Sequence, residues 1–220
     1  MLEELGRALG LVAIVSGRSA SQLLEWLGGG IELWGVHGAE RTVDGRIELT
    51  DAAKPHAELM ASVLKEARSA LDQLALPGVV LEDKTIMIGL HFRAAADRAR
   101  ARAALDSLAQ DLADRYGLLR AGGRLAFELR PPQEFSKADV VRDRAKGFAA
   151  AGFVGDDVVD LPGFDALDEL GAEAVTLRVA VNSSEAPEEL LRRADVIVDG
   201  PQGVLALLRR MVEVAGGAQI

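Results

Sequence analysis

Two hydrophobic patterns divide the chain. Toward both ends, short unbroken apolar runs alternate with helical stretches, and these runs occupy residues 11–15, 31–36, 175–181 and 195–198. An unbroken run of this length is typical of a strand buried on both faces in a parallel sheet. Alternation of such strands with helices predicts an α/β fold with a doubly wound, mostly parallel sheet. We assign residues 1–52 and 132–220 to this core.

The middle of the chain, residues 53–131, has a different periodicity. Residues 54–75 and 95–116 carry apolar side chains on one helical stripe, whereas residues 85–93 and 124–130 alternate apolar and polar. These segments predict a small inserted α/β cap whose helices cover one sheet face. The other face would present His91, Arg93, Glu128 and Arg130. It is either a solvated sheet face or a surface for a polar, anionic ligand.

An acidic stretch follows the apolar run that ends at Gly155. Asp156, Asp157 and Asp160 lie within five residues. Carboxylates gathered at a strand end suit Mg2+, which prefers oxygen ligands, but they also suit a turn that caps the next helix. Ser16 follows the run 11–15 and precedes a predicted helix, so it lies where phosphate binds helix N-termini. Capping of that helix by Ser19 or Ser21 is the alternative.

Composition narrows the classes of protein. The 220 residues have a net charge of -9, contain no cysteine and show no basic stripe with interleaved aromatic residues, so we expect no nucleic-acid partner. No apolar run approaches the length of about 20 residues that a membrane helix needs, and the first residues do not form a signal peptide. We therefore expect a soluble, cytoplasmic monomer whose partners are small molecules.

Several short motifs occur in a characteristic order. They are Val-Ser-Gly-Arg (15–18), His-Gly-Ala-Glu (37–40), Glu-Asp-Lys (82–84), His-Phe-Arg (91–93), Glu-Leu-Arg-Pro-Pro (128–132), Ser-Lys-Ala (136–138) and Gly-Asp-Asp-Val-Val-Asp (155–160). In this order the chain resembles the haloacid-dehalogenase-like phosphatases and, among them, the trehalose-6-phosphate phosphatases. The resemblance implies Mg2+-dependent hydrolysis of the small-molecule sugar phosphate trehalose 6-phosphate to trehalose and phosphate.

The resemblance also implies roles for individual residues. Ser16 and Lys137 would be catalytic, contacting the transferring phosphoryl group, and Asp156, Asp157 and Asp160 would bind Mg2+. The implied substrate-binding residues are Arg18, His37, Glu40, Glu82, Lys84, Arg93, Glu128 and Arg130. In one straight strand over 82–93, Lys84 and Arg93 would face opposite ways, so we expect a bend near Asp83.

One motif of the family is absent from the printed sequence. No Asp-x-Asp pair occurs in the 220 residues, although the resemblance implies that such a pair, on a central first strand, supplies the nucleophile. We expect the chain to be a phosphatase cut off before this strand. The alternatives are a non-catalytic sugar-phosphate-binding or regulatory domain and a phosphatase for another sugar phosphate, such as sucrose 6-phosphate.

Overall fold

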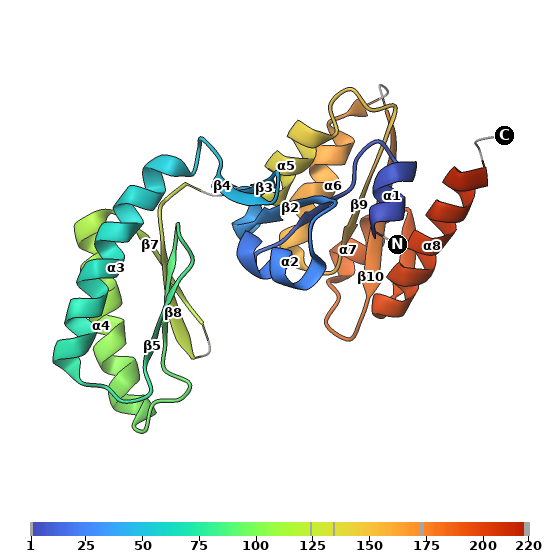
Figure 1. Ribbon diagram of the computed structural model, residues 1–220. Helices are drawn as coiled ribbons and strands as arrows, with labels where there is room; N and C mark the ends of the chain where they lie inside the picture. Colours follow the sequence, from blue (N-terminus) through green and yellow to red (C-terminus); the bar gives the residue numbers. More distant parts are fainter. Residues whose placement is uncertain (1, 124, 134, 172–173, 218–220) are drawn as a thin grey trace. The chain divides into compact units, whose positions relative to one another are not determined.

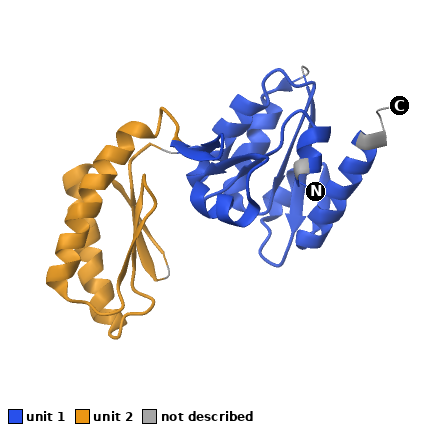
Figure 2. Cartoon of the chain, in the orientation of Figure 1, with its two compact units in different colours: residues 1–48, 135–220 blue, residues 49–134 orange. Residues whose placement is uncertain are grey.

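The computed structural model describes residues 2–123, 125–133, 135–171 and 174–217. It divides into two compact units (Figure 2). Unit 1 comprises residues 1–48 and 135–220, and unit 2 comprises residues 49–134. Unit 2 is therefore an insertion into unit 1. The cap expected from the sequence, residues 53–131, lies a few residues inside these bounds.

The first sheet of unit 1 has the order β1-β2-β3-β4. Its strands are β1 (Ala13–Val15), β2 (Glu32–Gly35), β3 (Glu40–Val43) and β4 (Arg46–Leu49). β1 and β2 are parallel, and β2 and β3 are antiparallel. Asp44 and Gly45, with φ of 49° and 73°, form the tight turn between β3 and β4. The two positive φ angles are those that this tight turn requires, and Asp-Gly is a dipeptide that adopts them readily.

The second sheet of unit 1 has the order β11-β10-β9 and is wholly parallel. Its strands are β9 (Ala150–Gly155), β10 (Val175–Asn182) and β11 (Val196–Asp199). The predicted parallel strands are present, but they form two sheets rather than one. Among the described residues, β1 pairs only with β2, and β9 pairs only with β10. No described strand joins β1 to β9, so each is the edge strand of its sheet.

Unit 1 also contains helices (Figure 1). They are α1 (Leu2–Ala8), α2 (Ala20–Leu27), α5 (Lys137–Arg144), α6 (Leu161–Asp168), α7 (Glu188–Arg193) and α8 (Gly200–Gly217), with the short 3-10 turns η1 (Val36–Gly38) and η2 (Val158–Asp160). α6 packs against β9 and β10, and its fully buried Phe164 meets Phe153 edge to face, with ring centroids 6.3 Å apart. α8 packs against β10, β11 and α1.

Unit 2 is an antiparallel sheet of order β5-β6-β8-β7 covered on one face by two helices (Figure 1). Its elements are α3 (Lys54–Leu74), β5 (Val80–Asp83), β6 (Ile88–His91), α4 (Arg98–Tyr116), β7 (Leu119–Gly122) and β8 (Ala126–Arg130). Met60 and Val63 of α3, Leu105 of α4, and Leu90 and Leu129 of the sheet belong to one buried core. The opposite face is polar, as the alternating pattern predicts.

A turn separates β5 from β6. The Lys84 N–H donates to the Met87 carbonyl at 3.0 Å, and Thr85 has a φ of 65°. The predicted strand 85–93 therefore begins only at Ile88, and the expected bend near Asp83 is confirmed. Residue 124, the start of the predicted strand 124–130, lies outside the described residues. No helix in the described ranges has the length and apolar character needed to cross a bilayer.

Candidate active site

Ser16 follows the carboxyl end of β1 and is held by main-chain bonds from two directions. Its N–H donates to the Trp34 carbonyl at 2.9 Å, and its carbonyl accepts from the His37 N–H at 2.8 Å. The Ser16 hydroxyl accepts from the Arg18 N–H at 3.2 Å. The loop between β1 and α2 is thereby fixed to the end of β2, and the hydroxyl lies at the start of a tight turn.

The amino end of α2 is capped from within the protein. Ser19 Oγ accepts from the Gln22 N–H at 3.3 Å, and Oε2 of the buried Glu40 accepts from the Ala20 N–H at 2.7 Å. These donors are therefore not free for phosphate, so the capping interpretation of Ser19 is confirmed. The carboxylate of Glu40, a predicted substrate-binding residue, thus contacts the α2 N-terminus, where a negative charge is favoured.

His37 lies directly over the Ser16 loop. A Cβ built on Gly17 would come within 2.8 Å of His37 Nε2, so only a glycine allows the ring this position. The backbone around it is unusual, since Val36 and His37 have φ of 48° and 57°. A β-branched residue in this region is strained, and such strain is concentrated at functional sites. Arg18 is exposed, and its guanidinium lies 4.8 Å from the centroid of the Trp26 ring.

Lys137 begins α5, whose amino end is set by a capping box between Ser136 and Asp139. Its ammonium donates to Asp160 Oδ1 at 2.5 Å. The other oxygen of Asp160 accepts from the Asp156 and Asp157 N–H groups at 2.9 and 3.1 Å. Asp160 is only 2% exposed. Its carboxylate therefore fixes Lys137 and the backbone of the acidic turn at the same time.

Asp156 and Asp157 differ from Asp160 in being exposed. Both come directly after the carboxyl end of β9, and Asp157 Oδ1 accepts from the Val158 N–H at 2.5 Å. The capping role that the sequence offered as an alternative is thus real for Asp157. Among the described residues, no group of three or more His, Cys, Asp or Glu side chains is placed to hold a metal ion.

α5 brings these two parts of the site together, because it packs against both η1 and η2. On one side, a Cβ on Gly38 would lie 2.6 Å from Val140 Cγ2 of α5. On the other side, Lys137 meets Asp160. The loop of Ser16 and His37 and the acidic turn therefore lie on either side of the α5 amino end. This is the carboxyl edge of parallel strands, where α/β folds bind ligands.

A second polar cluster lies on the open sheet face of unit 2. Lys84 Nζ is 2.9 Å from Glu128 Oε1 and 3.6 Å from Glu82 Oε2. His91 Nε2 is 2.7 Å from the same Oε2 atom. Burial lowers the pKa of Lys84, but its hydrogen bond to Glu128 and the charges of Glu128 and Glu82 outweigh this, so the pKa is raised. Lys84 is therefore firmly cationic at neutral pH.

The two remaining cations predicted for this face are placed differently from each other. Arg130 is half-buried on β8, two residues from Glu128, and so shares its sheet face. Arg93 is exposed and lies beyond the end of β6. Unit 2 thus gathers Glu82, Lys84 and Glu128 into one cluster. The link between His91 and Glu82 was missed in the sequence, although both belong to quoted motifs.

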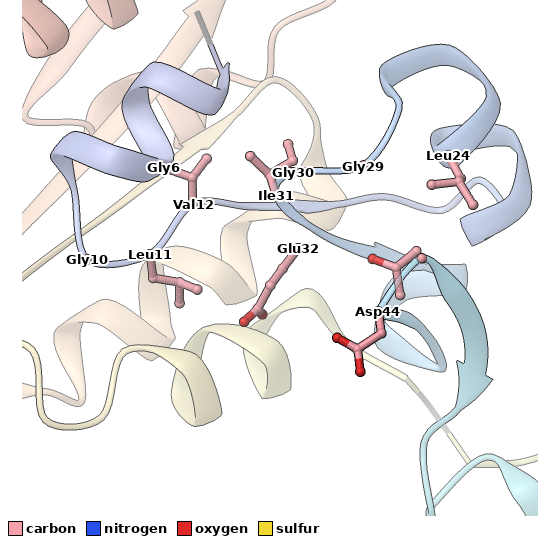
Figure 3. Close-up of a pocket in the computed structure, with 12 residues that line it drawn as sticks. Gly6, Gly10, Leu11, Val12, Leu24, Gly29, Gly30, Ile31, Glu32 and Asp44 are labelled. Carbon is pink, nitrogen blue, oxygen red and sulfur yellow. The ribbon is translucent and has the colours of Figure 1, made fainter.

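A cavity of about 360 Å³ lies elsewhere in unit 1 (Figure 3). Gly10, Gly29 and Gly30 line it, next to the amino ends of β1 and β2. Two acidic residues, Glu32 and Asp44, line it. Glu32 is already engaged, accepting from Trp34 Nε1 at 3.1 Å and from Arg144 Nε at 2.9 Å. Since Ser16 follows the opposite end of β1, this cavity is separate from the candidate site.

Comparison with known proteins decides the family. The family model of trehalose-phosphatase matches residues 1–195. The chain belongs to the trehalose-phosphatase family. A trehalose-phosphate phosphatase from Mycolicibacterium paratuberculosis is 32% identical over 181 residues, which cover 78% of this chain and 45% of the relative. The chain thus spans less than half the length of this curated relative.

Solved structures show the same fold. The C-terminal domain of the Candida albicans trehalose synthase regulatory protein matches with a TM-score of 0.64 and 17% identity, covering 94% of this chain and 84% of that chain. A haloacid dehalogenase-like hydrolase from Bacteroides thetaiotaomicron matches with a TM-score of 0.57 and 14% identity, covering 95% and 90%. This trehalose-phosphatase family member therefore has a haloacid-dehalogenase-like fold, an α/β core with an inserted cap, as its sequence predicts.

Proposed function

We propose that these residues form the phosphate-binding and sugar-binding parts of a trehalose-phosphatase, which hydrolyses trehalose 6-phosphate to trehalose and phosphate. The observation that carries the proposal is the ion pair of Lys137 with the buried Asp160, at the edge where the Ser16 loop and the acidic turn meet. A fixed cation beside exposed carboxylates suits phosphoryl transfer, in which catalysis is mainly positioning and electrostatic stabilisation.

In unit 1, Lys137 would neutralise charge on the phosphoryl oxygens and Ser16 would donate a hydrogen bond to one of them. Asp160 is a positioning residue in this proposal rather than a metal ligand. Its carboxylate already accepts bonds from one ammonium and two N–H groups. A cation approaching Asp160 Oδ1 would also meet the Lys137 ammonium, and like charges repel.

Haloacid-dehalogenase-like phosphatases generally use a divalent metal ion, and we propose Mg2+ for this one. Asp156 and Asp157 suit such an ion because both are exposed at the carboxyl end of β9. Mg2+ usually takes one or two protein carboxylates and keeps several waters. Two carboxylates therefore fit its needs without a larger cluster. The ion would add positive charge at the phosphoryl oxygens.

In unit 2, the cluster of Glu82, Lys84 and Glu128 would recognise the disaccharide, and unit 2 would serve as the cap. Carboxylates accept hydrogen bonds from sugar hydroxyls, and an ammonium donates to their oxygens. Arg93 and Arg130 would add positive charge beside a phosphorylated sugar. His37 and Arg18 remain proposed substrate contacts in unit 1.

The attacking group is the part of the reaction that the printed residues leave unassigned, since they contain no Asp-x-Asp pair. We propose that another stretch of polypeptide supplies it as a parallel strand between β1 and β9. Each of these strands is paired on one side only among the described residues. Such a strand would end beside Ser16 and Asp156, which follow β1 and β9.

A second candidate function is a non-catalytic domain that binds the sugar phosphate and regulates another activity. The absence of Asp-x-Asp favours it. So does the likeness in fold to the C-terminal domain of a trehalose synthase regulatory protein. This candidate keeps the roles of Lys137, Glu82 and Glu128 in binding but needs no attacking carboxylate.

Phosphate release from trehalose 6-phosphate separates the two candidates. It should be measured, with Mg2+ and with EDTA, for the 220-residue chain and for any longer protein translated from the reading frame that contains it. Mg2+-dependent release by either protein supports the hydrolase. Binding measured by calorimetry without phosphate release supports the regulatory domain. If neither binding nor release is detected, both candidates are excluded. Sucrose 6-phosphate, assayed in parallel, tests the choice of sugar.

A further inference from the structure

Gly89 occupies the centre of the polar sheet face in unit 2. Its Cα pairs with Glu82 across one strand boundary and with Glu128 across the other. The three residues therefore form one row, with the two glutamates about 10 Å apart at two strand spacings. A side chain at position 89 would rise between them. The missing side chain leaves the sheet backbone open at the place where both carboxylates converge on Lys84.

The space above Gly89 is partly filled by His91. A Cβ built on Gly89 would lie 2.7 Å from His91 Nε2 and 3.2 Å from Glu82 Oε2. His91 faces the same side of β6, two residues along, and its ring leans back over the glycine to reach Glu82. Because real Cβ atoms do not approach other atoms this closely, the hydrogen bond between His91 and Glu82 depends on a glycine at position 89.

The chemistry of the pair fixes its direction. An ionised carboxylate only accepts hydrogen bonds, so the His91 Nε2–H donates to Glu82 Oε2. Lys84 Nζ also lies 3.6 Å from Oε2. The hydrogen bond from His91 thus falls on Oε2, and we take Glu82 Oε1 as the oxygen that a ligand would use. The Glu82 side chain is 41% exposed, so a ligand can reach it.

We propose that His91 is a positioning residue for sugar recognition, which rests on the function proposed above. Seated over Gly89, it holds the Glu82 carboxylate in one rotamer, with Oε1 directed to a sugar hydroxyl. Lys84 holds Glu128 in the same way on the other side of Gly89. Without His91, Glu82 would have to be ordered by the ligand, and ordering a side chain on binding weakens affinity.

The test is a titration of the isotopically labelled chain with trehalose 6-phosphate, with trehalose and with inorganic phosphate, followed by NMR. His91→Ala and Gly89→Ala should each weaken binding of both sugars by about tenfold. Gly122→Ala is the matched control in the same sheet, since a Cβ there would meet nothing within 4 Å. His91→Gln, whose amide can donate to Glu82 from the same distance along the side chain, should recover most of the affinity.

The melting temperature separates positioning from folding. The pair of His91 and Glu82 is part-exposed, so His91→Ala should lower the melting temperature by no more than a few degrees. The inference is overturned if the sugar affinity is unchanged in both His91→Ala and Gly89→Ala. It is also overturned if His91→Ala loses affinity and His91→Gln does not recover it. If the unaltered chain binds neither sugar, the proposed function fails, and the inference fails with it.

Discussion

Two lysines anchor the two polar clusters of this protein, and their surroundings are opposite. Lys137 in unit 1 is 12% exposed and meets one carboxylate, Asp160, that is 2% exposed and bonded on both oxygens. Lys84 in unit 2 is 24% exposed and is shared by two carboxylates, Glu82 and Glu128, that are 41% and 42% exposed. The first arrangement is closed. The second has oxygens that remain open to solvent.

The difference indicates separate tasks. A buried pair must stay intact, because removing one partner leaves a charge buried without compensation. It therefore suits a group that must hold its position through a reaction. Part-exposed pairs contribute little to stability. Their side chains can therefore give up contacts with each other and form hydrogen bonds with the hydroxyls of a ligand. We thus expect substitution of Asp160 to disturb folding and substitution of Glu82, Lys84 or Glu128 to disturb mainly binding.

The largest expected effect is that of Asp160→Asn. This change removes the charge opposite Lys137 and places an amide where an oxygen accepts two N–H groups. The free energy of unfolding of unit 1 should fall by about 3–5 kcal/mol, as measured by urea denaturation. Glu128→Gln is the control in unit 2, and it should change the free energy by less than about 1 kcal/mol. Equal effects would remove the distinction between the clusters.

Gly155→Ala should give the next largest effect. A Cβ at this position would lie 2.5 Å from Asp160 Cβ, which is held close to the backbone and cannot swing away. We expect a loss of about 1–3 kcal/mol in the same denaturation experiment. Gly152→Ala on the same strand is the control, because its Cβ would come no closer than 3.4 Å to any atom outside its neighbours. A similar loss of stability in both variants would show that any side chain on this strand is destabilising, and that the contact with Asp160 is not the cause.

Lys84→Met tests the open cluster and its pH dependence. The raised pKa of Lys84 means that its pairing stabilises unit 2 below the unfolded value of about 10.4 and is lost as pH rises through the higher folded value. The stability difference between the unaltered chain and Lys84→Met should be small, below about 1 kcal/mol, and should vanish in strong alkali. A difference that grows with pH would contradict the ion pairing.

The smallest effect should come from Asp195→Asn. Hydrogen bonds from the Arg178 side chain and N–H lower the pKa of Asp195 to about 2. A lowered pKa stabilises the fold above the unfolded value of about 3.9, and this contribution is lost as pH falls through the folded value. Thermal melts from neutral to acid pH should therefore show the unaltered chain losing a small advantage over Asp195→Asn. A constant difference would rule out this linkage.

The fold was largely accessible from the sequence because its signals are local. The Asp44-Gly45 turn, the helix stripe through Met60 and the alternation around Leu90 each determine an element without reference to distant residues. β7 was missed because all four of its residues are exposed and carry no alternating pattern. α7, with six residues, is too short to show helical periodicity. The division into two sheets depends on pairing between distant strands, which local patterns do not record.

The site was less accessible, since the partners of its residues come from far along the chain. Spacing grouped Asp160 with Asp156 and Asp157, but burial and the bond from Lys137, 23 residues earlier, set it apart. The bond from the Ala20 N–H to Glu40, 20 residues later, was likewise not evident from the spacing of the motifs. The contact between His91 and Glu82 needs the hairpin of β5 and β6, and β5 was not predicted.

The most direct test of the division of labour is to map chemical shifts in the labelled chain under three ligands. Trehalose should shift the amides of Gly89 and Glu128 in unit 2, and inorganic phosphate with Mg2+ should shift those of Ser16 and Lys137 in unit 1. Trehalose 6-phosphate should shift both sets. If trehalose 6-phosphate shifts only one set, or if trehalose shifts the unit 1 set, the two clusters do not recognise separate parts of one ligand.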